Sequence, residues 1–192
     1  AALIDRAMAE LATGDMATAL ADANQAASLG SADPRVHLIR GIAAAAAGHS
    51  EEALREDNAL LQASPDDALG LAARSEVEAR LCQFPAALAD ASRAIALTPS
   101  ASGPYVDRAF TELQMRDFPA ALADAQKAAQ LNPRDAAAFT DKSLAEAALE
   151  RPDAALADAN QAVTLDPGNA VGFDARASAA LQKNCLLYTS DA

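Results

Sequence analysis

One four-residue phrase decides the fold, because it returns at a constant interval. It reads Ala-Leu-Ala-Asp at residues 87–90, 121–124 and 155–158. Counting back by 34 residues finds Ala-Leu-Arg-Glu at 53–56 and Ala-Leu-Ala-Asp again at 19–22. A fixed period of this length, with no insertion anywhere, is typical of stacked helical repeats. The prolines behind the phrase keep the same interval: Pro65, Pro99, Pro133 and Pro167.

Each unit is predicted to form two helices joined by a short turn. In the fourth unit we expect the first helix over about 102–115 and the second over about 118–131. Pro119 falls in the first turn of the second helix, where its missing N–H does no harm. Gly14 and Gly48 occupy the turn in the first two units, where a left-handed backbone costs glycine little. Every unit is therefore a helical hairpin.

Two first-helix positions recur in every unit, one with a small side chain and one with a large side chain. One hairpin cannot bury its apolar face alone, so we expect the units to stack through these positions. A small column on the second helices, from Ala19 to Ala155, would let the two helices of a hairpin approach closely. The small first-helix column is Ala7, Gly41, Ser75, Ala109, Ser143 and Ala177, and the large one is Leu3, His37, Leu71, Tyr105, Phe139 and Phe173.

The composition supports helices and argues against several classes of function. Of the 192 residues, 52% are apolar but only 4% are aromatic, so alanine and leucine dominate the apolar set, and both favour helices. A formal net charge of −12 disfavours binding to nucleic acids and to anionic membranes. The longest apolar run, Ile42 to Ala47, is too short for a membrane-spanning helix. Two cysteines cannot form a disulfide framework or a zinc site, and we predict no cofactor.

The period, the small–small helix contact, the large residue early in the first helix and the proline after the second helix resemble the tetratricopeptide repeat family. The resemblance implies an all-α, right-handed α-solenoid of antiparallel helix hairpins. In two first-helix columns Arg and Glu replace Leu and Tyr, a variant similar to bacterial repeats with Arg followed by a small residue. The resemblance covers residues 1–184, as units 1–33, 34–67, 68–101, 102–135 and 136–169 and a partial sixth unit 170–184.

The last eight residues, 185–192, break the repeat after Asn184. They resemble the out-of-frame translation of a sequencing adapter, in which case Cys185 and Tyr188 are not native; a native frayed terminus is the alternative. Since the chain also starts inside a repeat, we expect it to be a fragment.

Charged residues recur at the same interval on both helices. A basic first-helix residue is followed sixteen residues later by an acidic one, and the sign of each charge is kept where the residue changes. We predict a bridge within each hairpin; a bridge between neighbouring hairpins and an ion-binding ladder are the alternatives. Arg176 should lack a partner, because the sixth second helix is absent. The predicted pairs are Arg6–Asp22, Arg40–Glu56, Arg74–Asp90, Arg108–Asp124 and Lys142–Asp158. In four units a glutamate also stands four residues after the basic residue: Glu10, Glu78, Glu112 and Glu146.

The family resemblance implies that first helices line a concave groove that binds partners. Val106, Phe110 and Leu113 follow helical spacing and should share one face. The stripe could also be core, which exposure would decide. The groove residues we predict are Leu38, Ile42, Leu69, Glu76, Val106, Asp107, Phe110, Leu113, Thr140, Asp141 and Leu144.

Catalytic residue sets are missing from the sequence. His37 belongs to the large packing column, His49 falls in a turn, and Cys82 has no base partner and is expected to be a buried apolar residue. We therefore predict no enzyme but a protein–protein interaction scaffold that binds a peptide or helix of a partner. The alternatives are a docking array of a larger bacterial enzyme and a structural spacer. The compartment stays open between cytoplasm and periplasm.

Overall fold

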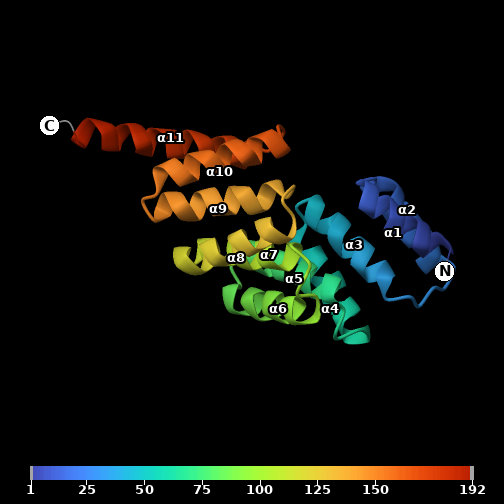
Figure 1. Ribbon diagram of the computed structural model, residues 1–192. Helices are drawn as coiled ribbons and strands as arrows, with labels where there is room; N and C mark the ends of the chain where they lie inside the picture. Colours follow the sequence, from blue (N-terminus) through green and yellow to red (C-terminus); the bar gives the residue numbers. More distant parts are fainter. Residues whose placement is uncertain (1, 191–192) are drawn as a thin grey trace. The chain divides into compact units, whose positions relative to one another are not determined.

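The computed structural model describes residues 2–190, and side chains for residues 2–183. Within that range the chain forms eleven α-helices and no strand. It divides into two compact units, residues 1–97 and residues 98–192. The first unit contains α1 (Ala2–Thr13), α2 (Met16–Ser28), α3 (Arg35–Ala46), α4 (Ser50–Ala63), α5 (Ala68–Arg80) and α6 (Phe84–Leu97) (Figure 1). The second contains α7 (Gly103–Gln114), α8 (Phe118–Leu131), α9 (Ala136–Ala148), α10 (Pro152–Leu165) and α11 (Ala170–Ser190).

The helix bounds agree with the predicted hairpin. α7 falls one residue short of the expected 102–115 at each end, and α8 matches the expected 118–131, with Asp117 capping α8 through the backbone N–H of Ala120 at 3.3 Å. α11 continues as helix to Ser190, beyond the expected end of the repeat pattern. The side chains of 184–192 lie outside the described residues, so the adapter interpretation of this segment stays a prediction.

Each unit is a stack of hairpins with the same contact pattern. In the first unit α1 packs on α2, α3 on α4 and α5 on α6; α2 and α4 also contact the first helix of the next hairpin, and α1, α3 and α5 contact one another in order. In the second unit α7, α9 and α11 form the corresponding row, with α8 and α10 packed against them. The all-α helical repeat solenoid expected from the sequence is therefore present.

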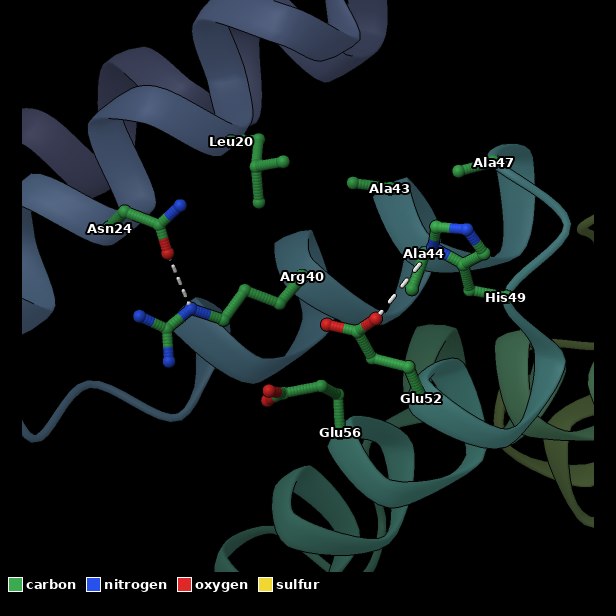
Figure 2. Close-up of a pocket in the computed structure, with 9 residues that line it drawn as sticks. All are labelled: Leu20, Asn24, Arg40, Ala43, Ala44, Ala47, His49, Glu52 and Glu56. Carbon is green, nitrogen blue, oxygen red and sulfur yellow. Dashed lines mark hydrogen bonds and ion pairs between the residues drawn. The ribbon is translucent and has the colours of Figure 1, made fainter.

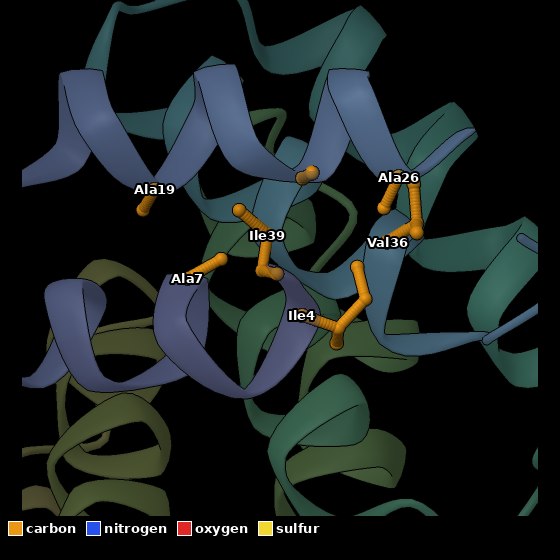
Figure 3. Packing of buried hydrophobic residues seen from close by; sticks show 7 residues of the cluster. Ile4, Ala7, Ala19, Ala26, Val36 and Ile39 are labelled. Carbon is orange, nitrogen blue, oxygen red and sulfur yellow. The ribbon is translucent and has the colours of Figure 1, made fainter. Parts of the chain in front are cut away.

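Small and branched residues form the core where three helices meet. Ile4 and Ala7 of α1, Ala19 of α2, and Val36 and Ile39 of α3 are buried in one cluster (Figure 3). Alanine at the contact lets the backbones approach closely, and the isoleucines fill the space between hairpins. The small-column residues Ala7 and Ala19 are thus packing positions, whereas in the predicted large column Leu71 is fully buried and Phe173 is 39% exposed.

Serine takes part in the close contact in two hairpins. The hydroxyl of Ser75 donates to the carbonyl oxygen of Ala87 at 2.8 Å, and Ser143 does the same to Ala155 at 2.8 Å. Both serines are fully buried. A buried hydroxyl needs such a partner, and a backbone carbonyl is within reach only because the two helices lie so close.

The turn inside every hairpin uses a left-handed residue at the same repeat position. In the first two hairpins this residue is glycine, at Gly14 (φ 83°) and Gly48 (φ 79°). The next three hairpins adopt the same conformation without glycine, at Cys82 (58°), Arg116 (62°) and Glu150 (59°). The turn geometry is therefore imposed by the packing of the hairpin, not by glycine.

Candidate functional site

The charged columns meet between the two helices of their own hairpin. Arg74 on α5 donates to both carboxylate oxygens of Asp90 on α6, at 2.5 and 3.0 Å. Arg6 makes the same bidentate contact with Asp22. In the second unit Arg108 binds Asp124 at 2.5 and 2.9 Å, and Lys142 binds Asp158 at 2.9 Å. These acceptors are more buried than most surface carboxylates, so water screens the pairs only partly.

One arginine also reaches the preceding hairpin. A second nitrogen of Arg74 donates to the side-chain oxygen of Asn58 on α4 at 2.9 Å. Arg74 therefore links α4, α5 and α6. The contact with the preceding hairpin is a hydrogen bond to a neutral amide, and the ion pair of Arg74 with Asp90 stays within its own hairpin.

The predicted pair Arg40–Glu56 is wrong. Arg40 donates through Nε to Asn24 at 2.8 Å, and Glu56 contacts Nδ1 of His37 at 2.6 Å. His37 stands one helical turn before Arg40 on α3, and the extra methylene of glutamate lets its carboxylate reach that far. Substituting Glu for Asp preserves the charge but changes the partner.

The glutamates four residues after the basic column lie against the same bridges. Each of Glu10, Glu78, Glu112 and Glu146 has a buried Oε2 atom without a hydrogen-bond partner. Loss of solvent raises the pKa of Glu78, Glu112 and Glu146 to about 7, and the adjacent aspartates add to the shift. Burial likewise raises the pKa of Glu10. One cation thus faces two carboxyl groups, and burial raises the pKa of the glutamate.

The predicted groove residues differ widely in exposure. Leu38, Thr140 and Asp141 are buried and offer a partner little surface, so for them the prediction of an accessible groove position is wrong. Thr140 turns its hydroxyl to the carbonyl of Ala136 in its own helix, at 2.9 Å. Burial raises the pKa of Asp141 to about 8. Leu69 is 62% exposed. The remaining positions are half-buried: Ile42, Glu76, Val106, Asp107, Phe110, Leu113 and Leu144.

The stripe of Val106, Phe110 and Leu113 on α7 is partly core and partly accessible surface. Leu113 packs against the cluster of Ala121, Leu122 and Ala145, and so belongs partly to the core. Val106 and Phe110 are half-buried and lie outside that cluster. Their exposed parts leave apolar surface on the first-helix side of the second unit.

The described residues do not assemble a metal site. Groups of three or more His, Cys, Asp or Glu side chains suited to a metal ion are absent from them. Cys82 is exposed, contrary to the expected buried state, because it occupies the left-handed turn position on the surface. No helix in the described range is long and apolar enough to cross a membrane.

Comparison with known proteins agrees with this geometry. The family model described as tetratricopeptide repeat matches residues 4–68 and 106–170, which together exceed half of the chain. The chain belongs to the tetratricopeptide repeat family. A search of the curated proteins finds no match.

Several solved tetratricopeptide structures share the fold. TTC0263, a protein from Thermus thermophilus, is 19% identical, with a TM-score of 0.76 over 93% of this chain and 97% of that one. YrrB, described as having an unusual peptide-binding site, is 20% identical, with a TM-score of 0.62 over 91% and 90%. The Cut9–Hcn1 structure gives a TM-score of 0.81 at 16% identity, over 93% of this chain and 35% of that one. At these identities the likeness establishes the repeat fold and no shared ligand.

Proposed function

We propose that this tetratricopeptide array is a protein–protein interaction scaffold whose first-helix face binds a peptide or helix of a partner protein. The observation that carries the proposal is the apolar surface on α7, where Val106 and Phe110 stay half-exposed although the helix is packed on α8 and α9. Apolar residues at helical spacing are the anchors that such grooves present to an amphipathic segment. The peptide-binding site named for YrrB, a protein of the same fold, supports the same role.

The substitution Phe110→Asp tests this proposal. A half-exposed phenylalanine that serves binding can be replaced with little effect on helix content or melting temperature, whereas partner binding should fall at least tenfold, as expected for a buried aromatic anchor. The measurement places a photo-crosslinking residue at position 106, with and without Phe110→Asp, in a lysate of the source organism. The matched control places it at exposed Lys127 on α8.

Distinct results would contradict the proposal. If Phe110→Asp unfolds the protein, the stripe is core. If the crosslinked partners are the same with and without Phe110→Asp, or the same as those found from Lys127, the binding surface lies elsewhere.

A further inference from the structure

A pocket lies in the second hairpin, at the place where the charged bridges are interrupted (Figure 2). It is bounded by α2, α3 and α4 and has a volume of about 380 Å³. Small-ligand sites begin at roughly 300 Å³, so the pocket has room for a molecule of amino-acid size. The predicted groove residues of α3, Leu38 and Ile42, do not line it. The pocket is therefore separate from the proposed partner surface.

Two departures from the repeat change the lining of this pocket. Where the other hairpins carry a glutamate, α3 has Ala44, and the removed side chain leaves room beside Arg40. Glu56 replaces aspartate and turns to His37, so it no longer binds the arginine. Two paired hairpins also have a pocket at the equivalent position, of about 230 Å³ beside Arg74 and about 310 Å³ beside Lys142, but there the cation is bound to the aspartate of its own hairpin.

One side of the pocket is apolar. Leu20 projects from α2, and Ala43, Ala44 and Ala47 form the adjoining surface of α3, as Figure 2 shows. This wall suits a short aliphatic group, because burying such a group there removes apolar surface from water without covering a polar atom.

The other side carries charges of both signs that do not neutralise one another. Arg40 donates through Nε to Asn24, and its two terminal nitrogens have no hydrogen-bond partner among the described residues. Glu52 and Glu56 face the same space, and neither carboxylate lies within 4.0 Å of Arg40. Glu52 forms an ion pair with His49 at 3.7 Å. A ligand with only a positive charge would be repelled by Arg40, and a ligand with only a negative charge would be repelled by Glu52 and Glu56.

We propose that this pocket binds an α-amino acid with a short aliphatic side chain, as its zwitterion. The ligand carboxylate accepts hydrogen bonds from the terminal nitrogens of Arg40 and from the side-chain amide of Asn24. The ligand ammonium donates to Glu52 and Glu56. The aliphatic side chain lies against the apolar wall. Such charge-assisted hydrogen bonds are the strong kind, and each end of the ligand requires its own protein partner.

The direct test is an NMR titration of ¹⁵N-labelled protein with L-leucine. We expect saturable shifts of α2–α4 amides at a ligand concentration of about 1 mM, the weak end of specific binding. Two compounds that each lack one charged group serve as probes: 3-methylbutylamine and 4-methylpentanoate. Each should bind at least tenfold more weakly than leucine.

Two variants connect the shifts to the pocket. Ala44→Glu restores the glutamate of the other hairpins, which should fill the pocket, face Arg40 and abolish leucine binding. Ala96→Glu adds the same charge at an exposed position of α6 and should leave binding unchanged. Arg40→Gln should weaken leucine binding at least tenfold without changing the affinity for the amine. Circular dichroism checks the fold, and if Arg40→Gln unfolds, Ala44→Glu still decides the test.

Three results would overturn the proposal. Equal affinity for 3-methylbutylamine and leucine would mean a site for a basic side chain. Equal affinity for 4-methylpentanoate would mean an anion site. An absence of saturable shifts, or leucine binding that survives Ala44→Glu, would mean that the pocket does not hold an amino acid. The partner-binding surface on α7 would be unaffected by any of these results.

Discussion

Asp57 occupies a position where the other hairpins have alanine. It is 0% exposed, and neither carboxylate oxygen has a hydrogen-bond partner. Gly41 on α3 makes room for it, because a Cβ atom at Gly41 would collide with the Asp57 carboxylate. Loss of solvent raises the pKa of Asp57 to about 7, which keeps much of it protonated at neutral pH. The corresponding alanines are Ala23, Ala91, Ala125 and Ala159.

Replacing this carboxyl group should stabilise the protein. Asp57→Ala removes a buried polar group without a partner, and we expect a gain of about 1–3 kcal/mol in unfolding free energy. Gly41→Ala alone should destabilise, because its methyl group meets Asp57. The double variant should be at least as stable as Asp57→Ala, so the two effects should be strongly non-additive. Urea denaturation of the four proteins measures the cycle, and additive effects would contradict the close contact.

The bridges provide a second test at single residues. Asp90→Asn should cost about 1–3 kcal/mol, because the half-buried Arg74 loses a buried partner, and the pair therefore lies between a fully exposed and a fully buried ion pair. Glu56→Gln is the matched control in the hairpin where the bridge is not made, and it should cost less. Thermal and urea unfolding provide the comparison. Equal costs would show that the bridge adds nothing beyond an ordinary polar contact.

At the scale of elements, all five hairpins have a left-handed residue at the same turn position. The left-handed residue lets the chain leave the first helix and start the second within a few residues. In the fourth hairpin Arg116 is left-handed, and the next residue, Asp117, already caps α8 through the backbone N–H of Ala120. Non-glycine residues accept this conformation at a cost of about 1–2 kcal/mol. The hairpin contacts compensate for that cost in the third, fourth and fifth repeats.

Substitutions at this turn position should change the stability of the protein in opposite directions in different repeats. Gly48→Ala should destabilise by about 1 kcal/mol through backbone strain alone, since a Cβ atom there meets nothing within 4 Å. Cys82→Gly should be neutral or stabilise by up to about 1 kcal/mol, because strain is removed while the unfolded chain gains freedom. Differential scanning calorimetry of both variants checks the signs. A stabilising Gly48→Ala would mean that the turn is not strained by side chains.

At the scale of the whole molecule, buried acids make stability depend on pH. Glu78, Glu112 and Glu146 have a folded pKa of about 7, against 4.5 for an ordinary glutamate, and Asp141 has one of about 8. Between pH 4.5 and 7 the folded protein holds more protons than the unfolded chain, so the unfolding free energy falls as pH rises through this window. Asp22 and Asp33 have a lowered pKa, and their contribution is lost only as pH falls below their ordinary value of 3.8.

The protein should therefore melt higher at pH 5 than at pH 8, by about 5 °C or more. Glu112→Gln should raise the melting temperature at pH 8 and reduce the difference between the two pH values, because it removes one of the titrating groups. Glu51→Gln, at an exposed position of α4, lowers the net negative charge equally and is the matched control. A melting temperature that rises from pH 5 to pH 8, or equal effects of the two substitutions, would contradict this account.

The sequence by itself determined the 34-residue period, the hairpins and most of the charged pairs. These follow from spacing along one or two adjacent helices, as Arg108 and Asp124 show. Only the tertiary structure decided that burial raises the pKa of Glu112 to about 7, that Leu38 is buried, that Cys82 is exposed and that Arg40 turns to Asn24. The physical reason is that desolvation and the choice of hydrogen-bond partner depend on atoms from several elements packed around a side chain. Repeat spacing alone does not specify those distances.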